Sequence, residues 1–156
     1  KKPLIGVVVG SESDREVMAE CVKVLEELGI GYEFLVSSAH RTPARTRRYA
    51  HQAQGRGIRV IIAGAGAAAH LAGSIASETT LPVIGVPLGS SPLKGLDALL
   101  STVQMPAGVP VATMAIGKAG AKNAGLLAAE ILALHDRRIR RRIEAYRKQW
   151  RPKSSK

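Results

Sequence analysis

The chain has little of several features that would place it in particular protein classes. Its 156 residues include a single cysteine, Cys21, so the chain can form neither an internal disulfide nor a cysteine-based metal cage. This usage is typical of proteins from a reducing compartment. Aromatic residues make up only 3% of the chain and apolar residues 46%, so we expect a core of Val, Ile, Leu and Ala.

Long apolar runs are also missing. The longest weakly polar stretch, residues 61–76, is interrupted by three glycines and by His70. It falls short of the roughly 20 apolar residues that a membrane-spanning helix needs. Lys1-Lys2-Pro3 leads straight into an apolar run, without the separate hydrophobic region and cleavage site of a secretory signal. We therefore expect a cytoplasmic protein without a membrane-spanning helix.

Acidic residues are scarce, because 12 Asp and Glu face 23 Lys and Arg, for a net charge of +11. Such an excess raises the question of nucleic-acid binding. Much of it lies in residues 137–151, which hold eight basic residues and one acid. Four apolar residues in this segment recur at the spacing of an amphipathic helix: Ile139, Ile143, Tyr146 and Trp150. We expect this helix to pack on a neighbouring subunit.

The rest of the chain alternates between strand and helix patterns. Strands are expected over residues 4–9, 32–36, 60–63, 83–86 and 111–116. A first helix is expected from a capping box of Ser13 and Glu16 to a stop at Gly29, and a second from Thr42-Pro43 towards Gly55. Further helices are expected over residues 67–77, 96–103 and 121–134, with a turn at residues 64–66.

This alternation, without a hairpin signal, implies right-handed crossovers and a mostly parallel sheet covered on both faces. The sequence thus predicts an α/β fold, a three-layer doubly wound parallel sheet of five strands plus a C-terminal helix. Residues 1–135 would form the main domain. Residues 136–156 would be a basic helix and tail, part of the same domain or packed on a neighbouring subunit. Ligands of such folds bind at the carboxyl ends of the strands, where strand order reverses.

Two of the loops that follow strands carry groups suited to phosphate binding or proton transfer. The segment 10–14 offers two serine hydroxyls at the start of a helix, where a phosphate would bind, although Ser and Asp are equally typical N-cap residues there. His40 and Arg41 stand together after the second strand. Imidazole changes its charge near neutral pH, so His40 could transfer protons. The alternative is that His40 and Arg41 are ordinary surface residues without a role in catalysis.

A third loop, residues 64–70, loosely matches the dinucleotide-binding pattern G-x-G-x-x-G/A. The match is weak, because it lies in the third strand–helix unit and no acid follows the next strand to bind a ribose. Its small residues let a planar or anionic ligand approach the backbone N–H groups closely. His70 ends this loop, where a lone histidine is more often structural than catalytic.

Together these segments resemble the PurE family of N5-carboxyaminoimidazole ribonucleotide mutases. The resemblance extends from about Leu4 to His135 without large gaps. It is carried, in the family's order, by Gly10-Ser11-Glu12-Ser13-Asp14, Ser38-Ala39-His40-Arg41-Thr42-Pro43, Ile61-Ile62-Ala63-Gly64-Ala65-Gly66, Ala68-Ala69-His70-Leu71, Val103-Gln104-Met105-Pro106 and Ala115-Ile116-Gly117-Lys118-Ala119-Gly120-Ala121. It implies a flavodoxin-like fold, a homo-octamer, a ribonucleotide substrate, and catalysis without ATP, metal or organic cofactor.

The resemblance also implies roles for single residues. The phosphate would be bound by Ser11, Ser13 and Arg41, and the ribose hydroxyls by Asp14. His40 would be the general acid and base, while Ser38 and His70 orient the carboxylate or the loop. The remaining substrate-binding positions would be Ala39, Ala65, Gly66, Ala68 and Leu71. The resemblance further implies functional coupling to the ATP-dependent synthetase that makes the carboxyaminoimidazole ribonucleotide.

Two departures and two alternatives accompany this resemblance. The family usually has Gly where this chain has Ala67, and Pro where it has Ala72. An added methyl group at Ala67 would cost about 1 kcal/mol if that position needs a positive φ. One alternative function is the family's carboxylase branch, which uses free carbon dioxide. The distant alternative is a basic nucleic-acid-binding protein, but five aromatic residues leave little for base stacking.

Overall fold

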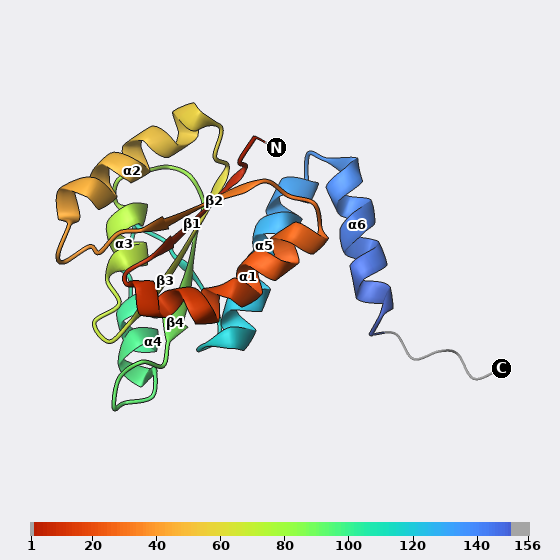
Figure 1. Cartoon of the computed structure of the whole chain (residues 1–156). Helices are drawn as coiled ribbons and strands as arrows, with labels where there is room; N and C mark the ends of the chain where they lie inside the picture. The colour runs from red at the N-terminus through yellow and green to blue at the C-terminus, as the bar shows by residue number, and fades with distance from the viewer. Residues whose placement is uncertain (1, 151–156) are drawn as a thin grey trace.

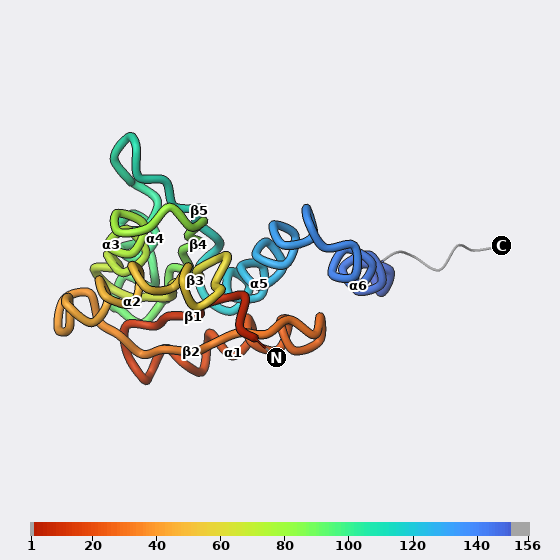
Figure 2. Tube along the Cα trace, turned by 90° about the horizontal axis from the view of Figure 1, so that it is seen from above, coloured from red at the N-terminus to blue at the C-terminus, as the bar shows by residue number. Residues whose placement is uncertain are grey.

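A five-stranded, all-parallel sheet forms the centre of the molecule (Figure 1), and Figure 2 shows its strands in the order β2-β1-β3-β4-β5. The structure is a computed structural model, and it describes residues 2–150. The strands are β1 (Ile5–Val9), β2 (Tyr32–Val36), β3 (Val60–Gly66), β4 (Val83–Leu88) and β5 (Ala112–Thr113). This arrangement confirms the predicted doubly wound α/β class, and strand order reverses between β1 and β3.

Helices cover both faces of the sheet, because the apolar side chains of its strands point to both faces and must be buried on each. They are α1 (Arg15–Glu27), α2 (Pro43–Arg56), α3 (Leu71–Ala76), α4 (Leu96–Val103), α5 (Lys118–Ala133) and α6 (Arg137–Lys148). The apolar sides of α1, α5 and α6 form one buried cluster with the sheet, and α2 and α3 form a second cluster on the opposite face. Figure 2 shows α1 and α2 on opposite sides of β1. None of the helices described is long and apolar enough to cross a membrane.

Strand β1 is buried along its whole length, because it pairs with β2 on one side and β3 on the other. Its side chains alternate between the two apolar clusters: Val7 belongs to the α1 face and Val8 to the α2 face. Gly6 also faces α2, where a Cβ atom would lie 2.1 Å from the Tyr49 hydroxyl. Glycine at this position therefore lets α2 pack directly on the strand.

Several predicted boundaries are wrong. Residues 64–66 are not a turn but the last part of β3, since Gly64 and Gly66 pair with Val86 and Leu88 of β4. The helix predicted from residue 67 begins only at Leu71. The strand predicted over residues 111–116 is reduced to Ala112–Thr113, the two residues that pair with Ile84 and Gly85 of β4.

The start of the first helix also differs from its prediction. A 3₁₀ turn, η1 (Glu12–Asp14), precedes α1, and no side chain caps either of them. The Ser13 hydroxyl instead lies 3.0 Å from the Ser11 hydroxyl. The capping box is therefore wrong, whereas the predicted stop holds: α1 ends at Glu27, and Gly29 adopts a left-handed conformation with φ of 63°.

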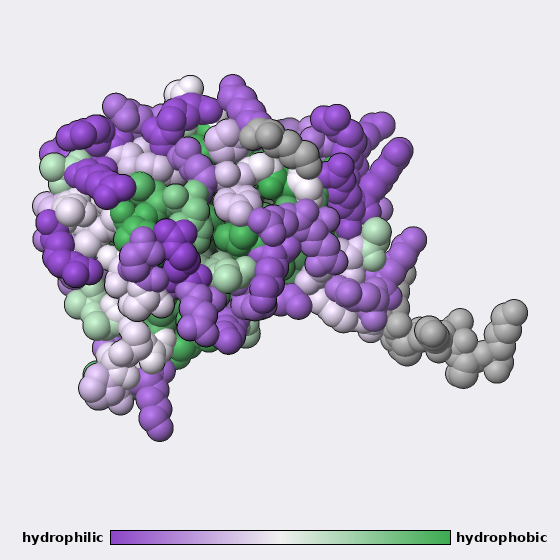
Figure 3. All heavy atoms as spheres, in the orientation of Figure 1, coloured by the Kyte–Doolittle hydropathy of each residue, from purple (hydrophilic) through white to green (hydrophobic). Residues whose placement is uncertain are grey.

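The C-terminal helix α6 packs against its own chain through most of its apolar stripe. Ile139, Ile143 and Tyr146 are buried with α5, while Trp150 is 56% exposed. Arg142 donates a hydrogen bond of 2.8 Å to the carbonyl of Leu28, which ties α6 to the end of α1. Intermolecular packing is thus not needed to bury the first three stripe residues. Figure 3 shows the hydrophilic side chains that cover α6 on the right of the view.

Candidate functional site

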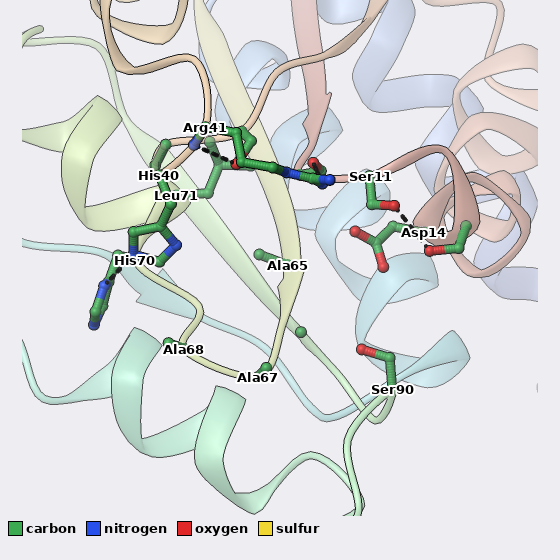
Figure 4. A pocket seen from close by; sticks show the side chains of 15 residues that line it. Ser11, Asp14, His40, Arg41, Ala65, Ala67, Ala68, His70, Leu71 and Ser90 are labelled. Atoms are coloured by element: carbon green, nitrogen blue, oxygen red, sulfur yellow. Dashed lines mark hydrogen bonds between the residues drawn. The ribbon is translucent and has the colours of Figure 1, made fainter.

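A cavity of about 250 Å³ opens at the carboxyl ends of β1, β2 and β3. This is where strand order reverses, the usual position of ligand sites in doubly wound sheets. Figure 4 shows side chains from four separate loops around it. The structure brings all twelve predicted site residues together here: Ser11, Ser13, Asp14, Ser38, Ala39, His40, Arg41, Ala65, Gly66, Ala68, His70 and Leu71. Three further lining residues were not predicted: Gly10, Ala67 and Ser90.

The first wall of the cavity comes from the loop after β1 and from η1. Because the Ser11 and Ser13 hydroxyls are not used as helix caps, both can bind a ligand. Asp14 is buried, with 7% of its surface exposed, and burial raises the pKa of its carboxyl group above the usual value. A hydrogen bond from the Ser11 backbone and the positive charge of Arg41 oppose this rise. The charged carboxylate is thus poised to accept hydrogen bonds from a ligand.

The second wall is the loop between β2 and α2, which its own hydroxyl groups hold in place. Thr42 precedes Pro43, the first residue of α2, as predicted. Its hydroxyl accepts a hydrogen bond of 3.1 Å from the Ser38 N–H and donates one of 3.0 Å to the Ser38 carbonyl. The Ser38 hydroxyl in turn accepts a hydrogen bond of 3.0 Å from the Arg41 N–H. These bonds fix the backbone on either side of His40.

Arg41 joins the second wall to the first. Its Nη2 atom lies 3.4 Å from the carbonyl oxygen of Gly10, and its guanidinium is near enough to Asp14 to affect that carboxyl group. Two serine hydroxyls and one guanidinium therefore border the same end of the cavity. This set of donors matches the acceptor oxygens of a phosphate group.

His40 and His70 meet across the cavity, although thirty residues separate them in sequence. The Nε2 atom of His40 lies 2.8 Å from Nδ1 of His70, and the rings meet edge to face, with centroids 4.9 Å apart. Within the described residues, Nδ1 of His40 has no hydrogen-bond partner. One of the two bonded nitrogens must carry a proton, so the tautomer of one ring sets that of the other. The remaining nitrogen of His40 is free to exchange a proton with a ligand.

The third wall follows β3. Ala67 has φ of 50°, in the left-handed region that disfavours residues with a Cβ atom. Between residues 2 and 150, the N–H groups of Ala67 and Ala68, two residues that line the cavity, make no hydrogen bond. These groups can therefore bind an anionic or carbonyl oxygen of a ligand. The sequence predicts that an alanine at this position destabilises the fold by about 1 kcal/mol if its φ is positive, and the structure meets that condition.

Comparison with known proteins links this site to one family. A family model described as AIR carboxylase matches residues 4–153. An N5-carboxyaminoimidazole ribonucleotide mutase of Bacillus subtilis is 58% identical over 146 residues, which is 94% of this chain and 90% of the relative. A Thermotoga maritima protein of the same name is 57% identical over 145 residues, covering 93% of this chain and 84% of the relative.

Solved structures agree with the sequence comparison. The crystal structure of Treponema denticola PurE superposes with a TM-score of 0.85 at 28% identity, covering 94% of this chain and 90% of that one. The likeness extends over nearly the whole length of both chains, so the fold and the sequence point to the same family.

Proposed function

The chain belongs to the AIR carboxylase (PurE) family, and we propose that it converts N5-carboxyaminoimidazole ribonucleotide to 4-carboxy-5-aminoimidazole ribonucleotide in purine biosynthesis. This reaction is an isomerisation. The observation that supports the proposal is the cavity itself, in which His40 lines the same space as Ser11, Ser13 and Arg41 at one end and the loop after β3 at the other. The relatives named above are mutases, which favours this reaction over the carboxylation that the family description names.

The nucleotide would lie with its phosphate on Ser11, Ser13 and Arg41. A dianionic phosphate at this end would neutralise the guanidinium and accept hydrogen bonds from both hydroxyls. Asp14 would accept hydrogen bonds from the ribose, which would compensate for the cost of keeping a buried carboxylate charged. The heterocycle would then extend toward His40 and His70.

His40 would both give and take the proton. It protonates the carbamate nitrogen as the N–C bond to the carboxyl group breaks, which releases carbon dioxide. Carbon C4 of the ring then attacks carbon dioxide, forming the new C–C bond. His40 finally removes the proton from C4, which restores aromaticity, so the proton count balances with no external acid or base. Nδ1 of His40 is the available nitrogen, because Nε2 is bonded to His70.

Carbon dioxide must not escape between the two steps. The side chains of Ala39, Ala65, Ala68 and Leu71, which line part of the cavity, have no polar atoms, and a small linear molecule would be held against them. Ser38 and His70 would act as positioning residues, since Ser38 bonds to the backbone beside His40 and His70 bonds to its ring.

We also propose a cytoplasmic homo-octamer that receives its substrate from an ATP-dependent synthetase. Support for subunit contacts comes from α4 and the loop before it. Leu96, Leu100 and Val103 recur on α4 at spacings of four and three, so they share one face of the helix. These three side chains and Leu93, in the loop before α4, are all at least 47% exposed. Light scattering tests the assembly, because Leu100→Glu would break up an octamer built on this face and leave a monomer unchanged.

The reaction is tested by supplying each branch's substrate separately at low bicarbonate. We expect N5-carboxyaminoimidazole ribonucleotide to be converted without added bicarbonate. Aminoimidazole ribonucleotide should be carboxylated only slowly, at high bicarbonate. Efficient use of aminoimidazole ribonucleotide with free carbon dioxide, and none of the carbamate, would assign the chain to the carboxylase branch instead.

A further inference from the structure

One wall of the cavity comes from an element that holds none of the predicted site residues. Ser90 lies in the loop between β4 and α4, and it lines the cavity next to Ala67 and across from Arg41 (Figure 4). The pairing of β3 with β4 explains its position. Gly66 is in register with Leu88, so the residues just after Leu88 must pass the end of β3.

Gly66 is the position that admits the Ser90 side chain. A Cβ atom on Gly66 would lie 1.9 Å from the Ser90 hydroxyl oxygen. Gly66 does not have a positive φ, so its backbone conformation suits any residue. Glycine at this position therefore serves to make room, and the group that it makes room for is the Ser90 hydroxyl.

The Ser90 hydroxyl is not used by the fold. Among the described residues it has no hydrogen-bond partner, in contrast to its neighbour Ser91. The Ser91 hydroxyl donates to a carboxylate oxygen of Asp97 at 2.9 Å and accepts from the Leu93 N–H at 3.2 Å. One serine of the pair thus holds the loop, and the other presents a free donor to the cavity.

We propose that the Ser90 hydroxyl binds the substrate by donating a hydrogen bond to the carboxyl group that migrates. This inference rests on the proposed function. The other side chains at this end of the cavity, from Ala65 to Ala68, have no polar atoms. A carboxylate placed there without a side-chain donor would lose hydrogen bonds that it makes in water. Ser90 supplies one such donor beside the N–H groups of Ala67 and Ala68, which have no hydrogen-bond partner among the described residues.

The test compares ligands with and without the carboxyl group. Ser90→Ala should weaken binding of 4-carboxy-5-aminoimidazole ribonucleotide by about tenfold, the effect of one hydrogen bond to a charged group. Binding of aminoimidazole ribonucleotide, which lacks the carboxyl group, should stay unchanged. During turnover, the variant should also release a larger share of its substrate as aminoimidazole ribonucleotide and free carbon dioxide.

Two further variants separate binding from loop structure. Ser91→Ala removes the hydroxyl that holds the loop, and it should leave the share of released carbon dioxide at the wild-type level. Gly66→Ala should displace the Ser90 hydroxyl and reproduce the loss seen in Ser90→Ala, and the two losses should not add in the double variant. Equal affinity of wild type and Ser90→Ala for the carboxylated nucleotide would overturn the proposal. Failure of the wild type to convert N5-carboxyaminoimidazole ribonucleotide would instead overturn the proposed function.

Discussion

Nε2 of His40 lies 2.8 Å from Nδ1 of His70, so the two imidazoles form one hydrogen-bonded pair across the cavity. When His70 accepts, Nδ1 of His40 is unprotonated and can remove a proton. When His70 donates, Nδ1 of His40 can carry the proton and give it away. In the proposed reaction, His70 would thereby position His40 and couple its two protonation states.

Substitutions at His70 distinguish the effect of its hydrogen bond to His40 from the effect of the packing of its ring. His70→Phe keeps the ring but removes the hydrogen bond, and we expect kcat to fall by roughly 10- to 100-fold with little change in KM. His70→Asn retains a hydrogen-bonding side chain and should recover part of the lost rate. The pH dependence of kcat should change in both variants. Equal kcat values for Phe and wild type would show that the bond is not used.

We expect the charged carboxylate of Asp14 to lower the stability of the folded protein while it contributes to nucleotide binding. Burial raises the pKa of its carboxyl group, so the folded state holds more protons than the unfolded state at acidic pH between the two pKa values. Stability therefore falls as pH rises through that window, and the charged carboxylate remains a cost at neutral pH. We expect Asp14→Asn to raise Tm at pH 7 and to weaken nucleotide binding at least about tenfold.

The matched control for Asp14 is Glu16→Gln, at an exposed position in the first turn of α1, which directly follows Asp14. It should change neither Tm nor binding appreciably. The gain in Tm from Asp14→Asn should shrink as the pH is lowered. A lower Tm for Asp14→Asn at neutral pH would contradict the account.

Ala67 should be a weak point of the fold, because its φ of 50° suits glycine. Ala67→Gly is expected to raise the free energy of unfolding by about 1 kcal/mol, or roughly 2–4 °C in Tm for a chain of this size. Ala68→Gly, in the same loop without a positive φ, should not stabilise. Thermal denaturation followed by circular dichroism measures both, and equal effects of the two substitutions would rule out backbone strain as the cause.

Cys21 should be inert in the native protein. It is fully buried, and burial raises the pKa of its thiol to about 12. At pH 8 the reactive thiolate is therefore rare and inaccessible. An aromatic disulfide reagent should label the thiol only after denaturation. Rapid labelling of the folded protein would mean that the contact between α1 and the sheet opens readily.

Much of the site could be predicted from the sequence, because its polar residues lie directly after strands. Parallel strands place their carboxyl ends at one edge, so segments 10–14 and 37–42 had to meet there. The glycine pattern and small residues of the loop 64–70 indicated Ala65 and Gly66, and the resemblance to the PurE family added Ala39 and Leu71, which carry no chemical signal of their own. Their gathering in one cavity follows from the register of β1 with β3.

The errors arose where tertiary pairing overrides local preference. Glycine favours turns, yet Gly64 and Gly66 extend β3 because β4 pairs beside them. Ser13 is a good helix cap in isolation, but an extra 3₁₀ turn moves the helix start past it. Ser90 was missed because a serine in a polar loop has no distinctive pattern. The only sequence signal for Ser90 is its position in a loop that follows a strand. Its proximity to Gly66 becomes visible only in the folded structure.

The central claim is that His40 carries the proton in both directions, and His40→Asn tests it most directly. We expect the turnover of N5-carboxyaminoimidazole ribonucleotide to fall by ~10²- to 10⁴-fold. The dissociation constant of the nucleotide should stay within about threefold of wild type, because Ser11, Asp14 and Arg41 are untouched. Turnover near the wild-type rate in His40→Asn, with the nucleotide still bound, would contradict the account.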